Sequence, residues 1–501
     1  MTIAHQILRR RCRPSAGILP LLFIALALCA SYARAADTVT VGGRTYVNKG
    51  LVAVGRLPAD LRDKFGETFG SGSGLAGDPK SWARAADGYH GTVYLLPDRG
   101  YNVTGTIDFR ARLYRLTFAL QPPADPGAMP VDARQHTLDL KLDDTMLLRD
   151  AGGRPLTGLD PLIDGVRPAA GGFPAMPAAP NGAISLDAEA VVLMDDGTFF
   201  VGDEYGPYIY HFSAAGRMLS AIRPPEAFIP KRNGKDSFSS NNPGPGEPPV
   251  VPPNPATGRQ NNQGFEGVSL TPDGRYLVAV LQSATRQDGG DKPETRQNTR
   301  MLYYDISDRD HAKLVHEYVV PLPIFTDAKG QRRVAAQSEL HALDATHFLL
   351  ICRDVGNGYG LEGSTSRYRR VEIVDVSAAT DIAGSRYDGL VPVAPGGQLV
   401  AGVTPATLTS FIDINDNAQL NKFGLHNGEP NDRNNLYEKW EGMALLPALD
   451  PQNPRDFFLL VSNDNDFITQ NGFAAGAAYK DPSGADVDTM ILVYRVTLAH
   501  R

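Results

Sequence analysis

A glutamate recurs at the start of four similar segments, and carboxylates that recur in this way could form one site. In each segment an apolar run follows the glutamate, and after a polar turn a second apolar run ends in polar or charged residues. The four glutamates are Glu189, Glu266, Glu339 and Glu441. Carboxylates that share one site raise one another's pKa unless a cation compensates them. Because Ca²⁺ takes about six to eight such oxygen ligands, the recurrence predicts calcium as a cofactor.

A second set of polar residues ends the second apolar run of each of these four segments and of a fifth, similar segment at 72–100. These residues are Asp98 and Arg99, Asp203 and Glu204, Gln282, Arg353 and Asp354, and Asn463 and Asp464. We predict that Ca²⁺ is held by Asp203, Glu266, Glu339, Glu441 and Asp464. Glu189 is predicted to act as general base, and Arg99 and Arg353 are predicted to bind an anionic group. Substrate contacts are predicted from Ser73, Asp98, Glu204, His341 and Trp440.

A structural role is the alternative for each of these residues. A repeated acidic residue can cap a hairpin or pair with an arginine of the next repeat. This alternative explains any single glutamate as well as a ligand role does. It explains all four less well, because only Arg99 and Arg353 stand in equivalent places. His341 is assigned to the site because strand alternation places it on the same side as Glu339, whereas Trp440 could be a packing residue or a substrate surface.

Other catalytic and metal-binding motifs are absent from the sequence or incomplete. Residues 413–417 open like a calcium loop, but Ala418 stands where that loop needs Gly and Gly424 where it needs a bidentate Glu. There is no G-x-S-x-G, H-E-x-x-H or C-x-x-C motif. The acidic pattern is therefore the main indication of chemistry.

The same repeats predict the fold. The copies span 188–204, 265–283, 338–354 and 440–464, and a fifth copy at 72–100 carries Ser73 in place of the glutamate. Two strands joined by an Asp-containing turn, with further strands downstream, make a propeller blade whose first strand lines the central channel. We therefore predict an all-β fold, a β-propeller, in which the carboxylates meet at one mouth of the channel.

Long insertions make the number of blades harder to predict. Residues 165–182, 242–258 and 284–299 are rich in Pro, Gly or charge, and we interpret them as inserted surface loops because the repeat resumes after each one. Residues 38–47 are predicted to close the ring with C-terminal strands, and 398–413 could form a weaker blade. Six blades is the preferred count, and five or seven remain open.

Residues 1–35 have the pattern of a signal peptide, which leaves 36–501 as the predicted propeller domain. A basic stretch at 9–13 precedes an apolar run at 18–30, and Ala33-Arg34-Ala35 fits a cleavage site. The apolar run is shorter than the roughly 20 residues that span a bilayer, so no membrane anchor is expected after cleavage. These features predict a periplasmic or secreted protein.

The chain that follows the predicted signal peptide is acidic. It keeps 44 basic residues against 56 acidic ones, which argues against nucleic acid or an anionic membrane as a partner and favours bound cations. Its single cysteine, Cys352, lies in an apolar run and is predicted to be a buried, inert thiol. We expect a monomer whose partner is a small-molecule ester or phosphoester.

These motifs resemble the bacterial phytase-like family described as having "esterase-like activity of phytase". The resemblance covers nearly the whole chain after the signal peptide, and its segments are 73–75, 98–100, 189–216, 265–270, 282–284 and 440–467. It implies an exported propeller with ester or phosphoester hydrolase activity, and it implies no catalytic residues. Residues 462–466 read SNDND where the family more often has a DNN-like run, which favours Asp464 and Asp466 over Asn463 as ligands.

The leading hypothesis is an exported, metal-dependent hydrolase of a phosphoester or small carboxylic ester, with its site at the channel mouth. A non-catalytic, calcium-binding propeller that holds a ligand or a protein partner is the alternative, because propellers host many functions. A third hypothesis is a lactonase or a quinone-dependent sugar dehydrogenase, which would share the metal site in the propeller.

Overall fold

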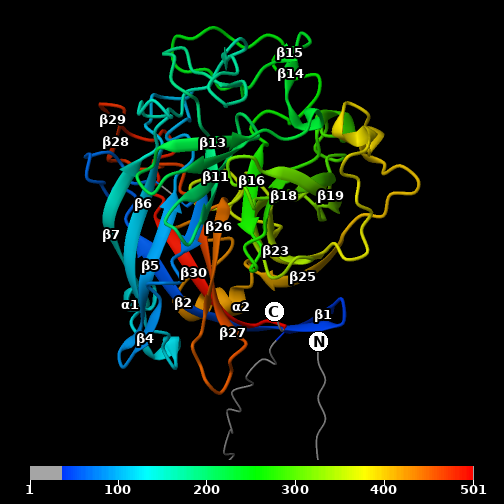
Figure 1. Ribbon diagram of the computed structural model, residues 1–501. Helices are drawn as coiled ribbons and strands as arrows, with labels where there is room; N and C mark the ends of the chain where they lie inside the picture. The colour runs from blue at the N-terminus through cyan, green and yellow to red at the C-terminus, as the bar shows by residue number, and fades with distance from the viewer. Residues whose placement is uncertain (1–36, 71, 500–501) are drawn as a thin grey trace, which may run out of the picture. The chain divides into compact units, whose positions relative to one another are not determined.

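The computed structural model describes residues 37–70 and 72–499. The predicted signal peptide lies outside these residues. Within them, five sheets of four or five strands form the blades of a β-propeller (Figure 1). The prediction of an all-β propeller is therefore confirmed. The blade count is five, which lies within the predicted range and is one fewer than the preferred count.

Each blade is an antiparallel sheet. In blades one to four, the innermost strand of the sheet is also the one that comes first in the sequence. Blade one comprises β3 (Gly74–Gly77), β4 (Ala83–Ala85), β5 (Gly88–Leu96), β6 (Arg112–Leu120) and β7 (Leu138–Leu147). Blade two comprises β10 (Ala188–Leu193), β11 (Phe199–Asp203), β12 (Ile209–Phe212) and β13 (Met218–Ile222). Blade three comprises β16 (Phe265–Leu270), β17 (Tyr276–Leu281), β18 (Asn298–Asp305) and β19 (Lys313–Pro321). Blade four comprises β22 (Ala336–Ala342), β23 (His347–Arg353), β24 (Arg369–Asp375) and β25 (Thr407–Asp413).

Blade five joins the two ends of the described chain, and this closes the ring. Its strands, in spatial order, are β26 (Trp440–Pro447), β27 (Asp456–Asn463), β30 (Thr489–Thr497), β2 (Arg44–Leu57) and β1 (Asp37–Val41). Figure 1 shows the blue strand β2 beside the red strand β30, and Val54 pairs with Leu492 there. The predicted closure by residues 38–47 is confirmed.

The innermost strands of the blades pack against one another in the order β3, β10, β16, β22, β26 and back to β3. Apolar layers fill the space between neighbouring blades, because alternate residues of each second strand face opposite neighbours. On β23, for example, Leu349 packs toward blade five and Leu350 toward blade three. Cys352 belongs to the layer between blades three and four, where burial raises its thiol pKa, so it is the buried thiol that the sequence predicts.

Short elements occupy the insertions between the main strands. The two-stranded hairpins are β8 (Val166–Arg167) with β9 (Met176–Pro177), β14 (Lys231–Arg232) with β15 (Lys235–Asp236), β20 (Ile324–Thr326) with β21 (Arg332–Val334), and β28 (Gly472–Ala474) with β29 (Ala477–Tyr479). The helical turns are η1 (Pro126–Ala128), α1 (Val131–Arg134), η2 (Glu226–Phe228), η3 (Arg286–Asp288), η4 (Arg386–Asp388), η5 (Pro395–Gly397), α2 (Asn417–Leu420) and η6 (Asn421–Phe423). Residues 398–413 form no weaker blade; they contain β25, the outer strand of blade four. None of the helices in the described residues is long and apolar enough to cross a membrane.

Candidate functional site: the carboxylates at the channel mouth

A β-bulge recurs at the beginning of the first strand in blades two to five. In each case one residue of the first strand is skipped in the pairing with the end of the second strand. The skipped residues are Glu189, Glu266, Ser338 and Glu441. Because a bulge changes the direction of a side chain at the end of a strand, it separates these residues from the interblade apolar layers.

Glu339 does not share the position of the other three glutamates, so the sequence alignment of the four is wrong at this blade. Ser338 is the bulged residue of β22, and Glu339 is in register with Ile351. Glu339 instead faces a cavity of about 500 Å³ that is lined by the innermost strands of all five blades. His341 lines the same cavity, so it accompanies Glu339 as strand alternation predicts.

Asp187, Glu189 and Glu204 form the first group of carboxylates at the mouth, which we call the Glu189 cluster. One oxygen from each lies within 4.8 Å of the other two, and all three side chains are buried. Burial raises the pKa of Glu189 well above its ordinary value, and the carboxylates of Glu266 and Asp187 raise it further. The cluster therefore holds more negative charge than its surroundings readily stabilise.

Three carboxylates at this mouth each keep one oxygen without a hydrogen-bond partner in residues 37–70 and 72–499. They are Oε2 of Glu204, Glu266 and Glu441. The other oxygen of Glu204 accepts from the Gly264 amide at 3.2 Å, and that of Glu266 accepts from the Gln282 side chain. Buried carboxylate oxygens without partners are costly, and a bound cation is one way to satisfy them.

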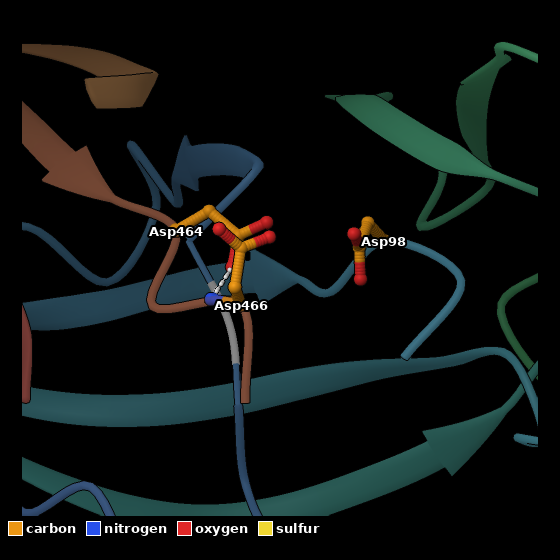
Figure 2. Close-up of side chains that lie close together, drawn as sticks. All are labelled: Asp98, Asp464 and Asp466. Carbon is orange, nitrogen blue, oxygen red and sulfur yellow. Dashed lines mark hydrogen bonds between the residues drawn. The ribbon is translucent and has the colours of Figure 1, made fainter. Parts of the chain in front are cut away.

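Asp98, Asp464 and Asp466 form a second group, the Asp464 cluster, whose oxygens also lie within 4.8 Å of one another. Asp464 and Asp466 come from the loop after β27 and face Asp98 from the loop after β5 (Figure 2). Lys439 reaches into this cluster, with Nζ 2.6 Å from Asp466 Oδ1. A pocket of about 300 Å³ lined by Asp466 and Tyr437 adjoins the cluster.

Both predicted arginines are buried and already paired with carboxylates. Arg99 Nη1 donates to Asp187 Oδ2 at 2.9 Å, and its backbone amide donates to the other oxygen at 3.1 Å. Arg353 donates to Glu441 and, through Nε, to Ser338 Oγ at 2.9 Å. The two arginines therefore hold carboxylates of the mouth in place, which is the structural alternative that the sequence offered and not the preferred role of binding an anionic group.

Asp203, a predicted ligand, has a structural role in blade two. Asp203 accepts hydrogen bonds from the amides of Asp187, Tyr205 and Gly206, and from the hydroxyl of Tyr210. With both oxygens used in this way, Asp203 organises the turn after β11 and has no oxygen left facing the cluster as a ligand.

Trp440 is fully buried in the apolar layer between blades four and five, where its indole donates to the Tyr437 carbonyl at 2.9 Å. It is therefore a packing residue and provides no substrate surface. Ser73, in contrast, lies at the mouth, where its hydroxyl donates to Asp464 Oδ2 at 2.9 Å.

Asp187, Lys439 and Ser338 belong to the mouth but were not predicted. Asp187 lies two residues before Glu189, so strand alternation could have placed both on one side. Ser338 was missed because the comparison by residue type matched the neighbouring Glu339 to the other glutamates. Lys439 has no counterpart in the other repeats, so the repeat comparison held no signal for it.

A model of the phytase-like family, described as "Esterase-like activity of phytase", matches residues 67–467. The chain belongs to the phytase-like family. A relative named "Uncharacterized secreted protein", from the fungus Arthroderma benhamiae, is 42% identical over 461 residues, which cover 86% of this phytase-like chain and 89% of the relative. Because this relative is fungal, the restriction to bacteria in the sequence resemblance is not supported.

Solved structures with a likeness to this phytase-like protein are distant. A crystal structure of a putative 6-phosphogluconolactonase from Bacteroides fragilis is 11% identical, with coverage of 82% of this chain and 84% of that one and a TM-score of 0.22. The aldose sugar dehydrogenase from Streptomyces coelicolor, in its PQQ-bound form, is 11% identical, with coverage of 91% and 92% and a TM-score of 0.27. Similarity at this level carries no functional inference.

The buried carboxylates predict how the stability of the metal-free phytase-like protein depends on pH. Burial, followed by the charge of Asp187, raises the pKa of Glu204 from 4.5 to about 7. Between these values the folded state binds more protons than the unfolded state, so stability falls as the pH rises. We expect Tm in EDTA to decrease between pH 5 and pH 8, and to decrease less in Glu204→Gln. A Tm that rises over this range would contradict the prediction.

Proposed function

We propose that this protein is an exported, metal-dependent hydrolase that acts on a phosphoester or a small carboxylic ester at the mouth of the propeller channel. The observation that carries the proposal is the Glu189 cluster together with the partnerless oxygens of Glu204, Glu266 and Glu441. Membership of the phytase-like family and the secreted relative support a hydrolase that works outside the cytoplasm. We further propose that it acts as a monomer.

The donor set at the mouth fits Ca²⁺, because the grouped side chains offer carboxylate oxygens. Asp187, Glu204 and Glu266 would hold the ion, with Glu441 beside them and Glu189 next to the site as the base. A cation bound there would polarise the ester oxygen and lower the pKa of a water molecule.

In this proposal Glu189 acts as the general base. Burial and the neighbouring carboxylates raise its pKa, which makes it a stronger base than an ordinary glutamate. Arg99 and Arg353 position Asp187 and Glu441. Arg99 also keeps a buried Nε–H without an acceptor among the described residues, which an oxygen of an anionic substrate would satisfy.

Hydrolysis of nitrophenyl phosphate, nitrophenyl acetate and phytate, each with and without chelator, tests the proposal. We expect at least one ester to be hydrolysed, and we expect the chelator to lower the rate by about a hundredfold or more, because a bound cation contributes several kcal/mol to the transition state. Added Ca²⁺ should restore the rate.

A non-catalytic, calcium-binding propeller is the second candidate, and the engagement of Arg99 and Arg353 with carboxylates favours it. If Ca²⁺ raises Tm but none of the three esters is consumed, this candidate replaces the hydrolase. Assays with a sugar lactone, and with a sugar, pyrroloquinoline quinone and an electron acceptor, separate both candidates from a lactonase or a dehydrogenase.

A further inference from the structure

The two carboxylate clusters at the mouth differ in how their charge is compensated. In the Glu189 cluster Arg99 is engaged with Asp187, Lys439 acts on Asp187 as a further, weaker positive charge, and Glu204 Oε2 has no partner among the described residues. In the Asp464 cluster each carboxylate has its own donor besides the lysine: Gly100 N for Asp98, Ser73 Oγ for Asp464 and Tyr437 Oη for Asp466.

The Lys439 ammonium group lies among the three carboxylates of the Asp464 cluster. Nζ is 2.6 Å from Asp466 Oδ1, 3.7 Å from Asp464 Oδ2 and 3.9 Å from Asp98 Oδ2. The oxygens are close enough together to hold one cation, and the ammonium group occupies the space between them. Because two like charges cannot share this space, a divalent cation can enter only if Lys439 leaves.

We propose that Lys439 is a tethered cation that fills the Asp464 cluster, so that the native mouth binds one exchangeable divalent cation, at the Glu189 cluster. The part that concerns the Glu189 cluster rests on the proposed function; the part that concerns Lys439 does not. The Lys439 ammonium group in the Asp464 cluster holds the loops after β5 and β27 together whether or not the exchangeable ion is bound.

Shortening Lys439 should open a second cation site. The adjoining pocket, lined by Asp466, gives a cation a route to the cluster, and the lysine side chain is 22% exposed. In Lys439→Ala, three carboxylates would remain without the ammonium group, and they would present the oxygen donors that Ca²⁺ prefers.

Calorimetric titration of the full chain with Ca²⁺, with metal analysis after dialysis, tests the proposal. We expect one Ca²⁺ per chain in the native protein, two in Lys439→Ala and one again in Lys439→Ala/Asp466→Asn. Two ions in the native protein, or an unchanged number in folded Lys439→Ala, would overturn it. No ion in the native protein but one in Lys439→Ala would leave the tethered cation standing and refute the metal site of the proposed function.

The variant could fail to fold without metal, and refolding then provides the readout. Ca²⁺ is expected to restore the native circular dichroism spectrum of Lys439→Ala but not that of Lys439→Ala/Asp466→Asn. If Ca²⁺ restores neither variant, the proposal fails.

Discussion

Replacement of Arg353 by methionine is expected to lower the free energy of unfolding by about 3–5 kcal/mol, the usual cost of removing one partner of a buried ion pair. Arg353 and Glu441 are both buried, and the arginine also donates to Ser338. Without Arg353, the Glu441 carboxylate would lose the cation that donates to it, in a region that already contains the Glu266 carboxylate. Guanidinium unfolding with linear extrapolation measures the loss.

Two further variants show whether the loss comes from the unpaired charge. Arg353→Met/Glu441→Gln should recover much of the stability, which gives a large coupling energy in a double-mutant cycle. Arg115→Met removes a partner of a half-exposed pair with Asp143 and should cost less than about 1 kcal/mol. Equal losses in Arg353→Met and Arg115→Met would show that the buried pair contributes no more to the free energy of unfolding than the half-exposed pair.

The sequence predicted the blades well because each copy combines two strands and a turn in a fixed order. It overestimated their number because β25 begins at Thr407, far along the chain from the end of β24 at Asp375. A strand that arrives so late is indistinguishable, in the sequence, from the start of another blade. Closure through residues 38–47 was predictable because this strand-like segment precedes the first copy of the repeat.

The site was harder to predict, because its register depends on bulges. An alignment by residue type places Glu339 with Glu266, yet a shift of one residue moves a side chain to the other face of a strand. A different signal was present in the sequence: the residue after the bulge is Gly267 in blade three and Gly442 in blade five. A Cβ atom on Gly267 would lie 2.7 Å from the Leu340 amide, so close packing of neighbouring strands favours a small residue there.

Replacement of Glu189 by glutamine is expected to lower kcat by about 10²–10⁴-fold on the ester that the protein hydrolyses, the usual contribution of a general base. The amide keeps the volume of the side chain but cannot accept the proton of the attacking water. Tm should not fall, because the substitution removes one negative charge from a buried group of like charges. Steady-state kinetics and thermal unfolding of the same preparation measure both effects.

Glu339→Gln is the matched control, because the sequence presents the two glutamates as equivalent and the structure does not. Glu339 faces the 500 Å³ cavity, and its Oε1 accepts from the Leu340 amide at 2.7 Å, so its change should leave kcat within about threefold, less than 1 kcal/mol in the barrier. Equal losses in the two variants would favour the sequence alignment over the observed register. A loss confined to Glu339→Gln would move the active site to the cavity, whereas a loss confined to Glu189→Gln would place the base at the bulge, where Glu189 adjoins Asp187 and Glu204.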